Sequence, residues 1–364
     1  MHHAQVAVIG GGIIGSSIAA EMARRGKTVT LIDGGTKTET PATPRSFGWI
    51  NAHSPQHAHH FQLRLDAMAA WRRLKQDQSA LPIAPITAID WDMAPEAMTT
   101  TQARYEDAGH ATRLMSHQEL EARFPDLNIG ADQAIISDMD MVADPGSITA
   151  FFREQAWSRG VKSFENRKVV RLEETGPGTK ILFSDGEQLN AETVVIAAGL
   201  GTPDLLASIG VLLPMNRRAG MLLRSNPQAQ KLGVLISAPD IHCWQLPDGR
   251  ILAGRNQAGR IDDGDLAGLN SDMARRLAAI APALSLVVFE NETIALRPEP
   301  ADGMPVLGRI AGHSNILVAV LHSGITLAPV IAELLAEQLE NKAPLERLAP
   351  YALERFDARE ALAS

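Results

Sequence analysis

The chain has very little cysteine: Cys243 is its only one. An internal disulfide is therefore impossible, and a cysteine-rich zinc or iron–sulfur site is excluded. This usage fits a reducing, cytoplasmic setting, and the first residues carry no charged segment followed by an apolar one, so we expect no signal peptide. No uninterrupted apolar run of about 18 residues occurs, so no membrane span is expected. Basic side chains are outnumbered 34 to 42 and the net charge is −8, which argues against nucleic acid as a partner.

Repeats and low-complexity tracts are also missing, while the length of 364 residues favours two domains. A short apolar strand at Gln5–Ile9 precedes a glycine cluster, a helix over Ile13–Arg25 and a second strand over Thr28–Ile32. This is a βαβ start, typical of an α/β domain. Further along, the pattern predicts helices at 61–75, 116–122, 145–160, 271–280 and 325–340, a β-meander over 169–199 and a buried strand at 316–321.

The glycine cluster fits the pattern G-x-G-x-x-G. Gly10 permits the tight turn out of the strand, Gly12 lets a pyrophosphate approach the backbone, and Gly15 allows close packing of helix on strand. Ile13 and Ile14 open the helix, whose free N–H groups point at the phosphates. Asp33 ends the second strand, where its carboxylate is placed to accept hydrogen bonds from a ribose. The alternative is a glycine-rich turn in an ordinary α/β protein, and the pattern alone does not choose between NAD and FAD.

Two further strings are more specific. The first runs from Leu296 to Gly308 and contains Arg297-Pro298 followed by Asp302-Gly303-Met304-Pro305. The second is His322-Ser323-Gly324-Ile325-Thr326-Leu327-Ala328-Pro329. Together with the N-terminal glycines they resemble the D-amino-acid oxidase / glycine oxidase / sarcosine oxidase family of FAD enzymes, and the resemblance extends from Val6 to about Leu339.

That resemblance implies an α/β (α+β) protein with a Rossmann-like FAD-binding domain and an inserted substrate domain built on a mostly antiparallel sheet. We expect the FAD-binding domain over 1–80, 144–215 and 295–364, and the substrate domain over 81–143 and 216–294. The implied reaction is oxidation of the C–N bond of an amino acid or secondary amine (a D-amino acid, glycine or a sarcosine-like amine) to an imine, by hydride transfer to flavin N5.

The resemblance also implies roles for individual residues. Arg297 matches the family's carboxylate-binding arginine, and a bidentate guanidinium suits that task; the alternative is a salt bridge, for instance with Glu299. His322 is a candidate for contact with flavin or substrate, or a packed loop residue. The candidate cofactor contacts are Gly10, Gly12, Ile13, Ile14, Gly15, Asp33, Arg45, Ser46, Gly48, Trp49, Val169, Ala198, Gly199, Ser323, Gly324, Ile325 and Thr326. Gly48 is expected to give room for the flavin ring and Trp49 to pack on it. His53 and the group His57, His59 and His60 lack metal-ligand spacing, and no metal is expected.

Two departures from the family pattern matter. One branch attaches FAD through a cysteine near the C-terminal loop, but Cys243 lies elsewhere, so non-covalent FAD is expected. That branch also uses a lysine to activate oxygen on a strand resembling Gly249–Gly254, where this chain has Arg250 and Leu252. The electron acceptor is therefore oxygen or another carrier. A flavin-binding subunit of a hetero-oligomeric dehydrogenase and an NAD(P)-dependent dehydrogenase remain alternatives, and the chain is a possible homo- or hetero-oligomer.

Overall fold

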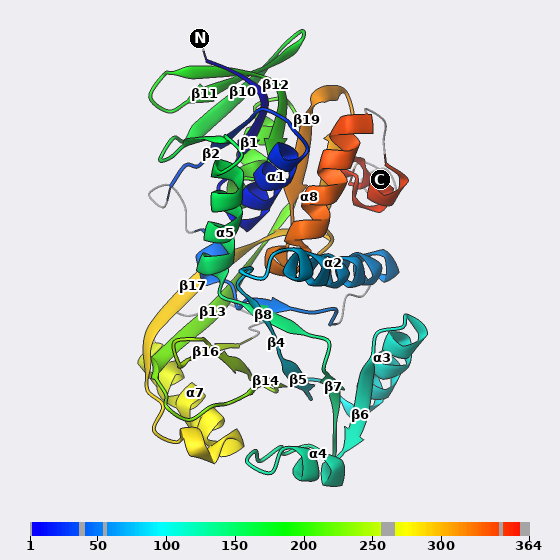
Figure 1. Ribbon diagram of the computed structural model, residues 1–364, viewed down its shortest axis with the longest axis vertical. Helices are drawn as coiled ribbons and strands as arrows, with labels where there is room; N and C mark the ends of the chain where they lie inside the picture. Colours follow the sequence, from blue (N-terminus) through cyan, green and yellow to red (C-terminus); the bar gives the residue numbers. More distant parts are fainter. Residues whose placement is uncertain (1, 36–40, 54–56, 256–265, 342–344, 357–364) are drawn as a thin grey trace.

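The computed structural model describes residues 2–35, 41–53, 57–255, 266–341 and 345–356. It is elongated, with one large sheet and its helices in the upper half of Figure 1 and a second large sheet in the lower half. The chain crosses between the halves several times, so each sheet collects strands from separated parts of the sequence.

The first sheet is built around the N-terminal strand β1 (His2–Ile9), which pairs in parallel with β2 (Val29–Ile32) and with β12 (Gln188–Ile196). Strand β12 then pairs in parallel with β19 (His313–Val320), so the N-terminal and C-terminal parts of the chain share one sheet. The remaining strands of this sheet are β9 (Lys162–Phe164), β10 (Val169–Thr175), β11 (Gly178–Phe183) and β18 (Val306–Ile310).

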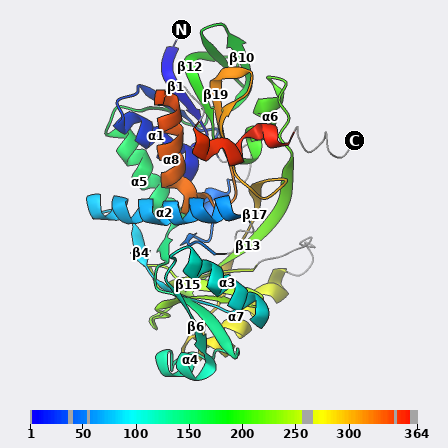
Figure 2. The same cartoon turned by 90° about the vertical axis from the view of Figure 1, so that its right-hand side faces the viewer.

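Four helices pack together beside the first sheet: α1 (Ile13–Arg24), α2 (Ala58–Asp77), α5 (Pro145–Trp157) and α8 (Gly324–Asn341). Helix α1 lies between α5 and α8, and its buried small residues Ser16, Ser17, Ala19 and Ala20 allow that close approach. Helix α2 crosses below α8 in both views (Figures 1 and 2), where the Trp71 indole N–H donates to the Thr326 carbonyl at 2.9 Å. The start of α8 is thus held in place by α2.

The second sheet has the strand order β17-β13-β16-β15-β14-β5-β7-β6 and is antiparallel except between β14 and β5. Its longest strands are β13 (Met215–Pro227) and β17 (Phe289–Pro300), which pair along most of their length and rise toward the first sheet (Figure 1). The others are β5 (Thr87–Asp90), β6 (Thr112–Ser116), β7 (Gln133–Ser137), β14 (Val234–Ala238), β15 (Ile241–Gln245) and β16 (Arg250–Arg255).

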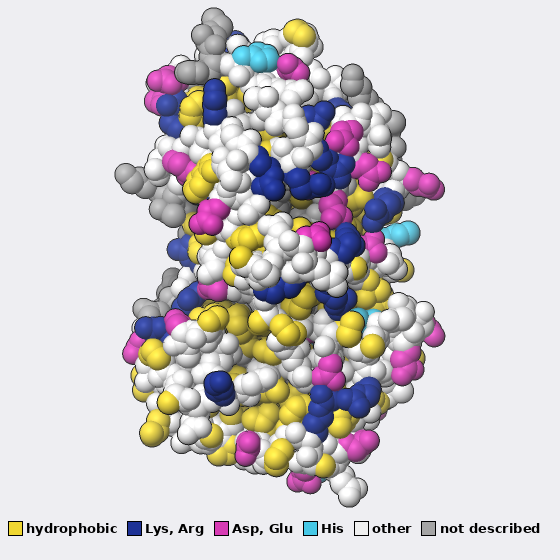
Figure 3. Space-filling model, viewed as in Figure 1, with side chains coloured by type: hydrophobic (Ala, Val, Ile, Leu, Met, Phe, Trp, Pro, Cys, Tyr) yellow, Lys and Arg dark blue, Asp and Glu magenta, His cyan; other side chains and the backbone are white. Residues whose placement is uncertain are grey.

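Shorter elements complete this half of the molecule. Helices α3 (Pro95–Asp107), α4 (His117–Arg123) and α7 (Leu266–Ile280) flank the second sheet. A small sheet of β3 (Trp49–Ile50), β4 (Ile83–Pro85) and β8 (Met141–Ala143) lies between the two large sheets. On the face shown in Figure 3, hydrophobic side chains gather over the lower half.

The predicted fold class is confirmed, with a mostly antiparallel second sheet. The expected helices are present; α4 begins with a capping box, in which Glu119 accepts from the Ser116 backbone N–H at 2.7 Å. The helix α3 was not predicted, since no element was assigned to its residues from the sequence. The domain boundaries stay a prediction, although β17 runs without a break through the expected boundary at 295.

Candidate active site

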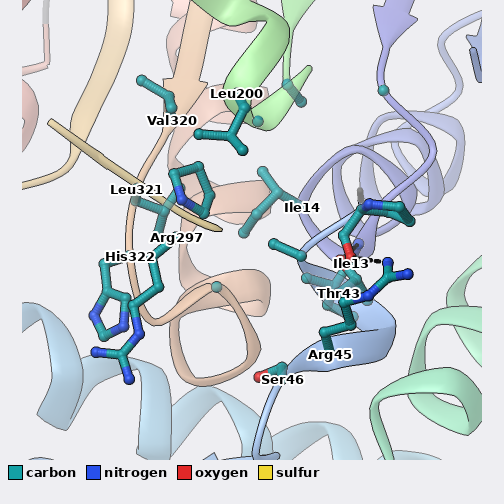
Figure 4. Close-up of a pocket in the computed structure, with 18 of the residues that line it drawn as sticks. Ile13, Ile14, Thr43, Arg45, Ser46, Leu200, Arg297, Val320, Leu321 and His322 are labelled. Atoms are coloured by element: carbon teal, nitrogen blue, oxygen red, sulfur yellow. Dashed lines mark hydrogen bonds between the residues drawn. The ribbon is translucent and has the colours of Figure 1, made fainter. Parts of the chain in front are cut away.

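A cavity of about 700 Å³ connects the two halves of the molecule. One end is lined by the glycine loop after β1, and the other by residues of β13, β15 and β17. We call these the dinucleotide end and the inner end. Figure 4 shows Ile13, Ile14 and Thr43 on one side of the cavity, with Arg297 and His322 on the other.

The glycine loop fits a phosphate cradle. Gly10 has φ +115°, and a Cβ there would lie 2.2 Å from the Ala197 carbonyl oxygen, so this turn requires glycine. A Cβ on Gly12 would meet only the Thr43 hydroxyl, at 3.0 Å, and would otherwise occupy the cavity. The same hydroxyl accepts the Ile13 backbone N–H at 3.1 Å, which places Thr43 at the N-terminus of α1. The backbone at this helix end is therefore open to an anionic group.

Gly15 has a different position from the other glycines of the motif. It does not line the cavity, and a Cβ there would lie 1.8 Å from the Gly10 carbonyl oxygen. Its function is the close packing of α1 on the loop, as the motif predicts, and it does not contact a ligand in the cavity.

Asp33 lies at the mouth of the dinucleotide end, where Arg153 of α5 forms an ion pair with it. The Gly35 backbone N–H donates to the other carboxylate oxygen at 3.0 Å. Arg153 also donates to the Gly11 carbonyl at 2.7 Å, so it ties the end of β2 to the glycine loop. A carboxylate oriented by two donors keeps lone pairs for a ribose hydroxyl, and Arg153 is a supporting residue that the sequence did not indicate.

The loop from Thr43 to Trp49 runs along the cavity and includes Arg45, Ser46, Gly48 and Trp49. A Cβ on Gly48 would lie 2.1 Å from the Ala143 carbonyl oxygen, and Gly48 has φ +79°. Close packing against β8 therefore requires glycine at this position. The expected role of Gly48 in leaving room for the flavin ring stays a prediction. The Trp49 carbonyl accepts the Thr326 hydroxyl at 3.1 Å, so the loop is joined to the first turn of α8.

The other predicted cofactor contacts line the same cavity from distant parts of the chain. Val169, Ala198 and Gly199 lie at the dinucleotide end, whereas Ser323, Gly324, Ile325 and Thr326 form the turn into α8. Ser323 has φ +64°, an uncommon backbone conformation for a residue other than glycine. The positive end of α8 opens on the cavity, which favours negative charge there.

Arg297 and His322 lie at the inner end, near each other in Figure 4. Burial lowers the pKa of Arg297. Gly220 lies beside it on β13, where a Cβ would come within 3.0 Å of the Arg297 Nε, so glycine leaves room for the guanidinium. Glu299, the alternative partner considered from the sequence, pairs with Arg218 at 3.7 Å. Its charge also acts on Arg297, where it raises the pKa of the guanidinium against the larger effect of burial.

Two neutral histidines accompany Arg297. Burial, with Arg297 next in importance, lowers the pKa of both His322 and His242 to about 3. His242 packs edge-on against Phe47 at 4.4 Å and stands over Gly254, where a Cβ would meet its ring at 2.2 Å. Both imidazoles are therefore uncharged near neutral pH.

A third histidine, His53, is held between two buried aspartates. Its Nδ1 lies 2.9 Å from Asp90 and its Nε2 lies 3.3 Å from Asp140. Burial acts to lower the pKa of His53, but Tyr105, Asp140 and Asp90 outweigh it and raise that pKa well above the ordinary value. Asp140 also accepts the Trp49 indole N–H at 2.6 Å. This cluster joins the loop after β3 to strand β5 of the second sheet and to the loop between β7 and β8.

The structure thus brings every predicted site residue except Gly15 to one cavity. Asn51, Arg64 and His242 of the inner end were not among the predicted site residues, and His53 was considered from the sequence only as a metal ligand. An arginine on the apolar face of the helix predicted over 61–75 was an available signal for Arg64. Among the described residues, no group of three or more histidine, cysteine or acidic side chains is arranged to hold a metal ion, and none of the described helices has the length and apolar character needed to cross a bilayer.

Comparison with known proteins gives a family match over nearly the whole chain. The family model described as "FAD dependent oxidoreductase" matches residues 5–338. An opine oxidase subunit of Rhizobium meliloti is 26% identical, covering 99% of this chain and all of that protein. Glycine oxidase of Bacillus subtilis is 25% identical, covering 93% of this chain and 94% of that protein.

Solved structures share the fold. Glycine oxidase from Geobacillus kaustophilus aligns with a TM-score of 0.83 at 22% identity, over 97% of this chain and 99% of that one. An L-amino acid deaminase from Proteus vulgaris, with its specific insertion deleted, aligns with a TM-score of 0.87 at 19% identity, over 97% of this chain and 94% of that one.

Proposed function

Because the chain belongs to the FAD-dependent oxidoreductase family, we propose that it oxidises the C–N bond of an amino acid or secondary amine to an imine, with Arg297 binding the substrate carboxylate. The observation that carries the proposal is the continuity of the cavity: Arg297 lines the same space as the glycine loop. The family's cofactor is FAD, which argues against the NAD(P)-dependent dehydrogenase considered from the sequence.

The residues fit FAD at the dinucleotide end. Gly12 and the N-terminus of α1 would hold the pyrophosphate, and Asp33 the ribose. The turn Ser323–Thr326 would place the positive end of α8 beside the ring. Cys243 is fully buried and does not line the cavity, which supports non-covalent attachment.

When bound, FAD supplies an acceptor for the hydride that leaves the carbon next to the substrate nitrogen. The chain contributes orientation: a guanidinium fork at Arg297 holds a carboxylate in one plane and fixes the neighbouring carbon. The positive surroundings also lower the pKa of a bound ammonium group, so they favour the neutral amine that can lose a hydride. His322 and His242 are uncharged and weakly basic, so we assign them contact and shape rather than proton removal.

The electron acceptor is proposed to be a carrier other than oxygen. Arg250, at the position compared with the family's lysine, donates to Glu290 at 3.2 Å and does not line the cavity, and Leu252 is buried in a hydrophobic cluster. Among the described residues lining the cavity, the only lysine is Lys168, at the dinucleotide end. A lysine cation beside the inner end is therefore missing from the described lining.

A second candidate is a flavin-binding subunit of a larger enzyme. Two relatives that match along their whole length, from Rhizobium meliloti and Agrobacterium tumefaciens, are each named as a subunit of an opine oxidase. Leu286 and Val288, 83% and 59% exposed, offer apolar surface for a partner near the end of the second sheet. Turnover by the isolated chain with an artificial acceptor would argue against this candidate.

An anaerobic screen tests the main proposal. The purified yellow protein is mixed with D-amino acids, glycine, sarcosine, cyclic imino acids and N-carboxyalkyl amino acids, and the loss of flavin absorbance is followed. We expect at least one carboxylate-bearing amine to bleach the flavin and its decarboxylated analogue to react far more slowly. Equal rates for both members of each pair would remove Arg297 from the proposed role.

A further inference from the structure

The unexplained feature of the inner end is Arg64. It comes from the middle of α2, is only 8% exposed and lines the cavity. Its Nη1 donates to the Asn51 side-chain oxygen at 3.0 Å and its Nη2 to the Ser323 hydroxyl at 2.5 Å, while its Nε is buried with no partner among the described residues. No acidic side chain in the described part of the chain forms an ion pair with it. A buried cation among neutral groups is costly unless an anion completes its surroundings.

The acidic side chains of the described cavity lining lie at one end. Its acidic members are Asp33 and Asp204, both at the dinucleotide end. The titratable side chains of the inner end are all basic: Arg64, Arg297, His53, His242 and His322. The aspartates that balance His53 do not line the cavity. Two arginines therefore face the inner end, and an amino acid with one carboxylate provides charge for one of them.

The hydrogen bonds of Arg64 also favour an anion. An arginine only donates, so the Ser323 oxygen is an acceptor toward Arg64. The Ser323 oxygen also lies 2.9 Å from Nδ1 of the neutral His322. In the tautomer in which this nitrogen accepts the Ser323 hydroxyl, His322 carries its proton on Nε2 and is a donor there. Arginine, histidine and the positive end of α8 together form a surface of donors with few acceptors, which suits an anionic ligand.

Resting on the proposed function, we propose that Arg64 forms a second anion subsite and that the physiological substrate is an amine with two carboxylates, one bound by Arg297 and the other by Arg64. A secondary amine whose two substituents each end in a carboxylate has this chemistry. Arg64 is then a specificity-determining residue, and Asn51 and Ser323 hold its guanidinium in place.

Binding of ligands that cannot be oxidised tests the subsite without turnover. Oxydiacetate carries two carboxylates on either side of an ether oxygen, and methoxyacetate carries one. Their dissociation constants are measured by calorimetry, and by perturbation of the flavin spectrum, for the wild-type holoprotein and the Arg64→Gln, Arg64→Lys, Arg297→Ala and Arg72→Gln variants. Arg72 is the matched control, because it lies on α2, donates to the Met139 carbonyl at 2.8 Å and does not line the cavity.

We expect the wild type to bind oxydiacetate at least tenfold more tightly than methoxyacetate. Arg64→Gln is expected to weaken oxydiacetate at least tenfold and methoxyacetate less than threefold, with partial recovery in Arg64→Lys and no change in Arg72→Gln. Equal affinities of the wild type for the two ligands would overturn the subsite, and this comparison needs no folded variant.

Two other outcomes would also refute it. Equal weakening of both ligands by Arg64→Gln would make Arg64 a general support of the cavity. Loss of flavin or a shifted flavin potential, with the preference for two carboxylates retained, would make it a cofactor residue. Failure of the proposed function looks different: Arg297→Ala would leave both affinities unchanged and no carboxylate-bearing amine would reduce the flavin.

Discussion

Replacing Arg297 by alanine removes the group proposed to bind the substrate carboxylate. Arg297 lies on β17 opposite Arg218 of β13, and burial opposes its charge, as its lowered pKa shows. Removing it therefore relieves a desolvation cost, and we expect the fold and the flavin content to survive. Arg218 is the matched control: its side chain is 68% exposed, pairs with Glu299 and does not line the cavity.

The size of the effect follows from desolvation. A charge-assisted pair removed from water contributes about 2–5 kcal/mol when one partner is truncated. At about 1.4 kcal/mol per tenfold change, substrate affinity falls by roughly 30-fold to several thousand-fold. Lysine restores part of the loss, since a point charge replaces a planar fork. Arg218→Gln, which removes an exposed charge, is expected to change affinity less than about threefold, in line with the small energies of surface pairs.

The assay is anaerobic flavin reduction by stopped flow against substrate concentration, with thermal melting and flavin content measured on the same samples. Each substrate is compared with its decarboxylated amine. We expect a loss confined to carboxylate-bearing substrates, because only these present an anion to Arg297. A similar loss for both kinds of substrate, or an equal effect of Arg218→Gln, would refute the assigned role.

Three further predictions concern the cofactor and the core. Gly12→Val fills space that is open apart from the Thr43 hydroxyl, so it should abolish FAD binding while leaving a cooperative thermal transition. Gly15→Val would place its Cβ 1.8 Å from the Gly10 oxygen, so it should destroy the thermal transition as well as FAD binding. Acid or heat should release free FAD into the supernatant, because the buried Cys243 is outside the cavity; a chromophore that precipitates with the polypeptide would contradict this. His53→Gln should cost about 3–5 kcal/mol in urea unfolding at pH 6, because it leaves two buried aspartates unbalanced. The pKa of His53 is raised on folding, so its contribution is complete below the unfolded pKa and is lost as pH rises through the folded pKa; the difference between wild type and variant should therefore shrink at alkaline pH.

Much of the fold could be predicted from local sequence patterns. The glycine loop, the helices α1, α5 and α8 and the strands beside them follow from periodicity and turn residues within short windows. The long strands β13 and β17 were not predicted as a pair, because their register joins Met215 to Pro300 across β14, β15, β16 and α7. Nothing within either segment indicates its partner, so the pairing depends on tertiary structure.

The candidate site divides in the same way, into residues that local sequence patterns identify and residues that only the folded chain brings together. Arg297 and the turn Ser323–Thr326 lie in strings specific enough to be recognised, and Gly10 and Gly12 in a motif with a mechanical reason for each glycine. Arg153 could not be identified, because its partners Asp33 and Gly11 lie more than a hundred residues earlier in the chain.

Arg64 shows why the groups that surround a charge at the inner end can be identified only from the folded chain. In the sequence its place on the apolar face of the helix predicted over 61–75 indicates burial, but not which groups it meets. Its burial follows from α2 crossing below α8, which brings it to Ser323, a residue 259 positions away. Ser323 in turn adopts a left-handed backbone conformation just before α8 begins, so the cation, the strained turn and the positive helix end meet at one point. A buried cation and a positive helix end oppose each other electrostatically, and a bound anion relieves that repulsion. A single carboxylate at Arg297 leaves Arg64 without such an anion. The packing of α2 against α8 therefore determines the charge of the proposed substrate as much as the recognisable motifs do.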